Sequence, residues 1–98
     1  MKYINNDLIW ALQEVLTGDT LTVYFENFTS LEGHYVVTWG IRDESEMGYT
    51  FNTLVDNEAD TLDYKQVQQD MMGVQQYLQD IGYEAHLHID ITGGFLNG

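Results

Sequence analysis

Residues 64–91 read YKQVQQDMMGVQQYLQDIGYEAHLHIDI, and the spacing of their apolar positions changes partway along. Up to Ile81 apolar residues recur every three or four positions, as in an amphipathic helix: Tyr64, Val67, Met71, Val74, Leu78 and Ile81. After Gly82 they alternate with polar residues, as in a strand buried on one face: Tyr83, Ala85, Leu87, Ile89 and Ile91. The segment therefore predicts a helix that covers a sheet and leads directly into one of its strands.

Alternation with a period of two also occurs in three earlier runs, residues 20–26, 34–42 and 49–55. Residues 28–33 connect the first two runs, and the turn-forming residues 43–48 connect the second run to the third. Short connections of this kind are typical of antiparallel neighbours. The three runs therefore predict a β-meander.

A shorter helix is predicted before these strands. Asn6 is a suitable N-cap and Asp7 favours the positive end of the helix dipole. Apolar residues recur at helical spacing within residues 8–16, and Gly18 provides a left-handed stop. Because a helix turns by about 100° per residue, Trp10 points away from the apolar stripe, and we expect it to be exposed.

The expected fold is a single α+β domain of residues 1–92, with the element order α-β-β-β-α-β. Its four-stranded sheet is mainly antiparallel and has two helices packed on one face. Residues 93–98, GGFLNG, form a flexible C-terminal tail. The other face of the sheet is left open and carries mostly polar residues: Thr22, Tyr24, Glu26, His34, Thr38, Arg42, Thr50, Asn52, His86 and His88.

The net charge is the most unusual property of the chain. Sixteen Asp and Glu residues stand against only Lys2, Arg42 and Lys65, which gives a formal net charge of −13. Small domains need a net charge of only about 2 to 8 units to stay soluble. Contacts to phosphates need Lys or Arg, so we expect no direct binding to nucleic acid or to membranes. A basic protein is the expected partner, because opposite charge speeds its encounter.

Seven acids fall within residues 43–63 with no Arg among them and no Lys: Asp43, Glu44, Glu46, Asp56, Glu58, Asp60 and Asp63. A dense carboxylate surface can imitate the phosphates of nucleic acid, and we expect these residues to bind the partner. Trp10 and Glu14 form a second expected contact, because Trp often anchors interfaces. The alternatives are ordinary solvated loops and a Trp10 turned into the core.

Other kinds of chemistry have less support. The absence of cysteine excludes disulfides and thiolate metal sites and favours a reducing cytoplasm. No signal peptide, membrane span, nucleophile turn or phosphate loop is found, so we expect neither enzymatic activity nor a cofactor. His86 and His88 could share a metal if His34 or a carboxylate supplied a third ligand. The alternative is a solvated polar strand face.

In size, acidity and lack of cysteine, the chain resembles phage-encoded DNA mimics such as anti-CRISPR and antirestriction proteins. The resemblance covers composition and element order and transfers no site residue. It implies a cytoplasmic inhibitor in a bacterial cell, encoded by a phage or mobile element, that occupies the nucleic-acid-binding surface of a basic protein or nuclease. Three alternatives stay open: an immunity protein or antitoxin for a basic nuclease toxin, a small metal-binding protein or enzyme using His86 and His88, and a homodimeric structural protein.

Overall fold

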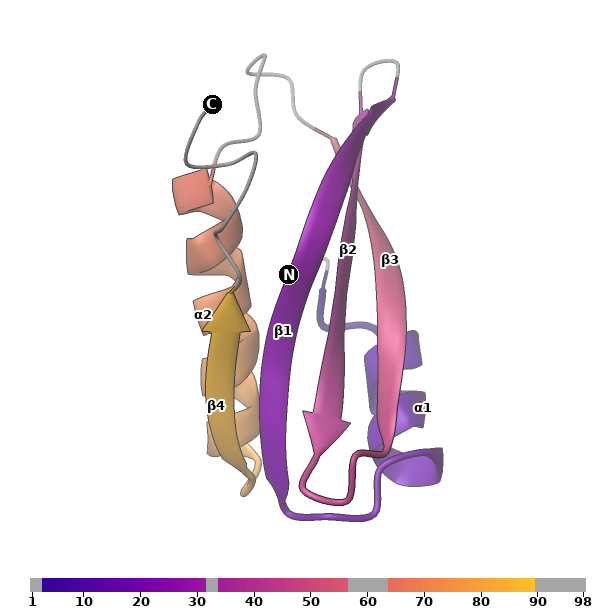
Figure 1. Cartoon of the computed structure of the whole chain (residues 1–98), viewed down its shortest axis with the longest axis vertical. Helices are drawn as coiled ribbons and strands as arrows, with labels where there is room; N and C mark the ends of the chain where they lie inside the picture. Colours follow the sequence, from indigo (N-terminus) through magenta and orange to yellow (C-terminus); the bar gives the residue numbers. More distant parts are fainter. Residues whose placement is uncertain (1–2, 32–33, 57–63, 90–98) are drawn as a thin grey trace.

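The computed structural model describes residues 3–31, 34–56 and 64–89 of the chain. Figure 1 shows the elements, which are α1 (Asn6–Glu14), β1 (Thr20–Leu31), β2 (His34–Asp43), β3 (Gly48–Asp56), α2 (Tyr64–Asp80) and β4 (Glu84–Ile89). The predicted α+β domain, with two helices and four strands in the order α-β-β-β-α-β, is confirmed. The tail predicted for residues 93–98 lies outside the described residues.

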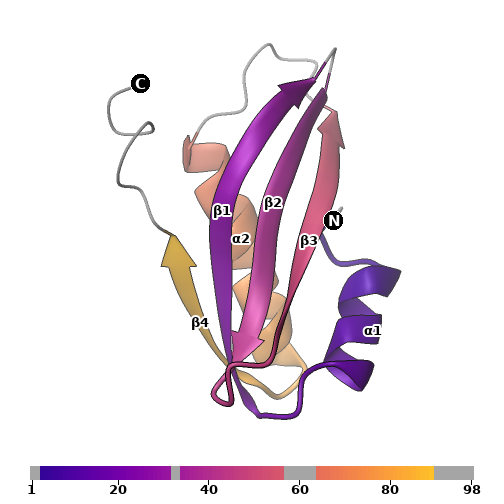
Figure 2. The same ribbon diagram turned by 45° about the vertical axis from the view of Figure 1, so that its right-hand side comes forward.

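The sheet has the strand order β3-β2-β1-β4. The pairs β1–β2 and β2–β3 are antiparallel, whereas β4 runs parallel to β1. Because β3 and β4 are the two edges, α2 crosses behind the sheet to connect them, as Figure 2 shows. The sheet is therefore mixed, with antiparallel pairing at two of its three junctions.

One face of the sheet and the inner sides of both helices enclose a single apolar core. Trp39 belongs to this core and is fully buried, with its indole N–H donating to the hydroxyl of Thr53 at 2.8 Å. Its ring stacks on Phe51 with centroids 4.6 Å apart. The predicted stripe of α2 is buried at four positions: Val67, Met71, Val74 and Leu78. Ile81, predicted as its last member, follows the end of the helix and is 47% exposed. Burial of each large apolar side chain contributes about 1.5–3 kcal/mol, so these contacts fix both helices on the same face.

The first strand is longer than predicted. β1 continues to Leu31, past a β-bulge in its pairing with β2: Phe25 is opposite Trp39, but Asn27 is opposite Thr38. The extra residue resets the alternation, so the second half of the strand is out of phase with the first. The prediction of a connection over residues 28–33 was therefore wrong, since residues 28–31 belong to the strand.

The ends of α1 also differ from the prediction. Asn5, and not Asn6, is the N-cap, and its side chain accepts two backbone N–H groups of the first turn at 3.0 and 3.2 Å. The helix ends before Val15, so Gly18 is not its stop. Gly82, by contrast, follows α2 in the left-handed conformation, with φ 109°.

The open face of the sheet has a compact polar arrangement around Gly40. The hydroxyl groups of Tyr24 and Thr50 lie 3.0 Å apart, so the Tyr24 side chain crosses β2 above Gly40. A Cβ atom at Gly40 would overlap Tyr24 and lie only 2.7 Å from the backbone oxygen of Tyr49. Arg42 lies over the Tyr24 ring, with its guanidinium carbon 5.5 Å from the ring centroid. Glycine is therefore required at this position.

We expect Gly40→Ala to lower the free energy of unfolding by about 1–3 kcal/mol, because the new methyl group displaces a packed ring and presses on backbone. Chemical denaturation measures the change. The double variant Gly40→Ala/Tyr24→Thr should lose less stability than the sum of the two single variants, because the ring is then absent. Strictly additive losses would contradict the overlap.

Candidate functional site

Several acidic connections meet at the end of the sheet where β1 and β4 begin and β2 turns into β3 (Figures 1 and 2). The register places Thr20 beside Glu84 and Leu21 beside Asp43. Six exposed acidic residues lie on the connections and element termini at this end of the molecule: Glu14, Asp19, Glu44, Glu46, Asp80 and Glu84. We call these six residues the acidic end.

Asp43 ties two of these connections together. Its Oδ2 accepts the backbone N–H groups of Thr17 at 2.9 Å and Gly18 at 3.1 Å, and the hydroxyl of Thr17 at 3.3 Å. Its Oδ1 accepts the backbone N–H groups of Ser45 at 2.8 Å and Met47 at 3.0 Å. One carboxylate thus joins the α1–β1 connection to the β2–β3 turn.

These donors also set the charge state of Asp43. The N–H of Thr17, helped by the other backbone N–H groups, lowers the pKa of Asp43 below its ordinary value of 3.8, against the opposing effect of burial. The residue is only 5% exposed. The partner-binding role predicted for Asp43 does not fit this placement, because its carboxylate is buried and a partner cannot reach it. Asp43 is therefore not part of the acidic end.

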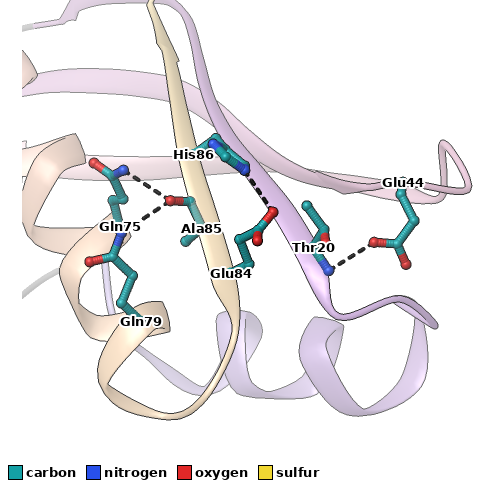
Figure 3. Close-up of polar contacts among 7 residues, drawn as sticks. All are labelled: Thr20, Glu44, Gln75, Gln79, Glu84, Ala85 and His86. Carbon is teal, nitrogen blue, oxygen red and sulfur yellow. Dashed lines mark hydrogen bonds and ion pairs between the residues drawn. The ribbon is translucent and has the colours of Figure 1, made fainter.

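Glu44 extends the same arrangement by one residue. Its Oε1 accepts the N–H of Asp19 at 3.2 Å and its Oε2 accepts the N–H of Thr20 at 2.8 Å, the second of which is drawn in Figure 3. Four consecutive backbone N–H groups, residues 17–20, therefore face acidic side chains. Gly18 permits the close approach, since a Cβ there would overlap the Glu44 carboxylate. Glu44 itself stays exposed and adds to the acidic end.

The predicted histidine pair lies on the open face beside the acidic end. His86 Nε2 lies 3.0 Å from Glu84 Oε2 (Figure 3). His34 begins β2 at the opposite end of the sheet, so it does not join His86 and His88. Within the described ranges, no group of three or more His, Asp or Glu is arranged to hold a metal ion.

The predicted acidic residues of the other connection are only partly described. Asp56 closes β3, but its side chain lies outside the described residues, as do Glu58, Asp60 and Asp63. β3 has nine residues, which at about 3.4 Å per residue separates Gly48 from Asp56 by roughly 27 Å. Glu46 and Asp56 therefore lie towards opposite ends of the sheet and do not belong to one surface.

The two α1 residues predicted to bind a partner are both exposed. Trp10 is 48% exposed, as the helical spacing predicted, and Glu14 ends the helix. Sequence reasoning did not predict that Trp10 also packs against Tyr49 of β3, with ring centroids 5.3 Å apart at 70°. The only sequence signal for this contact was that Tyr49 shares a face with Phe51, which places it on the side of the sheet that the helices cover.

Three residues of the acidic end were missed from the sequence: Asp19, Asp80 and Glu84. They are single acids in separate segments, so no local run marks them, and only the parallel pairing of β4 with β1 brings them together. Hydrogen bonds from α2 to β4 also hold β4 in place. Gln75 and Gln79 both donate to the backbone oxygen of Ala85 in β4, at 3.0 and 3.1 Å (Figure 3).

No helix in the described part of the chain combines the length and apolar character needed to cross a membrane. Comparisons with protein-family models, with curated proteins and with solved structures found no match for this chain. Its function is therefore inferred from the arrangement of its own residues.

Proposed function

We propose that this protein is an acidic inhibitor that occupies the nucleic-acid-binding surface of a basic protein, such as a nuclease, by imitating DNA. One observation carries the proposal. In a chain of net charge −13, the fold gathers six exposed acidic residues from five separate segments at one end of the sheet. Surfaces that bind nucleic acid present Lys and Arg to a row of phosphates, and a row of carboxylates offers the complementary charge.

The acidic end is held in place by the fold. Asp43 and Glu44 fix the α1–β1 connection through four consecutive N–H groups, and Asp43 also fixes the turn that carries Glu46. Preorganised groups lose less conformational entropy when they bind. This favours a surface built to engage a partner over loops that merely carry charge.

The open face of the sheet has a different charge character. It carries Arg42 and all three histidines, His34, His86 and His88. Arg42 is also one of only three Lys and Arg residues in the chain. Since Arg42 is a positive charge and the six residues of the acidic end are all negative, we expect a basic partner to be attracted more to the acidic end than to this face.

The proposed setting is the cytoplasm of a bacterial cell, with the protein encoded by a phage or mobile element. The lack of cysteine suits a reducing compartment. An immunity protein would use the same electrostatics against a toxin nuclease, and the identity of the bound protein separates the two roles.

The test is capture followed by competition. The purified protein is immobilised, basic proteins are captured from a bacterial lysate at low salt, and each is released by a salt gradient. The affinity for the captured partner should fall by at least about tenfold between 50 and 200 mM salt, as expected when several ion pairs form. The partner should also release fluorescently labelled duplex DNA when this protein is added, measured by fluorescence anisotropy.

Two results would overturn the proposal. One is a partner that binds labelled DNA and this protein at the same time, because a mimic must exclude the DNA it imitates. The other is an affinity for the captured partner that does not change with salt.

A further inference from the structure

Trp10 and Tyr49 form an exposed aromatic pair at the border between α1 and β3. Trp10 is 48% exposed and Tyr49 is 39% exposed, although their rings touch edge to face with centroids 5.3 Å apart. Tyr49 rests in turn on Phe51, at 5.1 Å, and Phe51 stacks on the buried Trp39. The exposed pair is therefore the outer end of an aromatic row anchored in the core, and its position is fixed before any partner arrives.

Acidic residues stand on both sides of this pair. Asp7 lies three residues before Trp10 and Glu14 four residues after it, and all three are exposed in α1. Residues at these spacings are neighbours on a helix surface, with Cβ atoms about 5–6 Å apart. The indole ring therefore lies between two acidic residues on one stripe of the helix.

This combination selects the chemistry of the ligand. Aromatic faces attract cations, and Trp does so most strongly. The guanidinium group of arginine is planar, stacks on aromatic rings and donates a fork of N–H groups to carboxylates, whereas the ammonium group of lysine is a compact, strongly hydrated charge. An anionic ligand is repelled by Asp7 and Glu14, and a purely apolar one would strip water from them at a cost.

We infer that Trp10, Tyr49, Asp7 and Glu14 form a binding site for an arginine side chain on the surface of a basic protein. The inference rests on the proposed function, since it names the residue type through which the partner is recognised. Glu14 also belongs to the acidic end, so the site extends that surface along α1. Carboxylates alone distinguish arginine from lysine only weakly. In this site, the aromatic pair provides the selectivity for arginine.

The experiment uses two peptides of equal length and charge, hexa-arginine and hexa-lysine, titrated into the full chain by calorimetry at low salt. The unchanged protein should bind hexa-arginine more tightly than hexa-lysine. Trp10→Leu should weaken hexa-arginine binding by about three- to tenfold and leave hexa-lysine binding nearly unchanged. Leu54→Ala is the control, because Leu54 is an equally exposed apolar residue on β3, outside the pair.

Fluorescence gives a second readout of the same titration. The chain has two tryptophans, of which Trp39 is fully buried and Trp10 is half exposed. A change in emission on adding hexa-arginine therefore reports on Trp10, and the near-ultraviolet circular dichroism of Trp39 shows that each variant is folded.

A second pair of variants keeps the rings and tests the carboxylates. Asp7→Asn/Glu14→Gln and Glu26→Gln/Asp80→Asn each remove two negative charges from exposed positions. The first should weaken hexa-arginine binding by about threefold more than the second, since only the first removes acceptors beside Trp10. Equal losses would overturn the site.

The remaining outcomes separate the two proposals. If neither peptide binds, both the proposed function and this site are overturned. Binding of both peptides with equal affinity, unaffected by Trp10→Leu, overturns the arginine site and leaves the proposed function standing.

Discussion

We expect Asp43→Asn to lower the melting temperature by at least about 10 °C, because several hydrogen bonds to one buried carboxylate are lost together. The substitution preserves size and shape, but it replaces one acceptor oxygen with an N–H donor group. Oδ2 faces two backbone N–H groups and a hydroxyl, and Oδ1 faces two more N–H groups. Whichever way the amide is turned, its NH₂ group meets backbone donors. Thermal unfolding followed by circular dichroism measures the change.

Glu44→Gln is the matched control. It makes the same chemical change in the next residue, but Glu44 is exposed and water can replace its lost bonds. Its melting temperature should fall much less. An equal fall in the two variants would show that Asp43 holds no special position.

The stabilising effect of Asp43 should also depend on pH. The pKa of Asp43 is lowered in the folded protein, so the folded state favours the ionised carboxylate. Its contribution is fully present above the ordinary pKa of 3.8 and is lost as the pH falls through the lower folded-state value. The difference in unfolding free energy between the unchanged protein and Asp43→Asn should therefore be constant near neutral pH and shrink below pH 3.8. A difference that grows in acid would contradict this.

The second large effect concerns association. Glu46→Lys/Asp80→Lys should slow association with the captured basic partner by at least about tenfold at low salt, because it places positive charge in the acidic end. Each substitution adds two charges, so the pair changes the net charge from −13 to −9. Stopped-flow or surface-based kinetics measures the association rate over a range of salt concentrations.

The control variant has the same net charge, but its added positive charges lie outside the acidic end. Glu26→Lys/Gln68→Lys/Gln69→Lys also gives a net charge of −9, but it alters the bulge of β1 and an exposed part of α2. It should slow association far less. If both variants slow it equally, only total charge matters and the acidic end has no specific role.

The fold was largely predictable because apolar residues recur at regular spacings in most of its helices and strands. The α2 stripe, the alternation of β4 and the exposure of Trp10 all follow from the spacing of apolar residues. The second half of β1 was not predicted, because the bulge at Glu26 breaks the alternation at a point where the strand continues. Strand order could not be read from the sequence either, since β4 pairs with β1, which lies more than fifty residues earlier.

The candidate site was predicted less well than the fold. The sequence showed where acidic residues are frequent, but not which of them accept hydrogen bonds within the chain and which stay free to bind a partner. Asp43 and Glu46 look alike in the sequence, yet the first accepts N–H groups 25 and 26 residues away and the second is exposed. Such long-range hydrogen bonds leave no local pattern. Asp19 and Glu84 are the opposite case. Each is a single acid in the sequence, and the pairing of β4 with β1 brings it next to the other residues of the acidic end.

An inhibitor that binds its target in a one-to-one complex must reach the concentration of that target. At such concentrations an exposed edge strand can pair with the same strand of another copy, and the chains can polymerise. Two glutamines of α2 partly cover the edge strand β4. Gln75 and Gln79 already occupy the backbone oxygen of Ala85, which an incoming strand would otherwise use. Together with the mutual repulsion of chains carrying −13 each, this contact disfavours the addition of a further strand at β4.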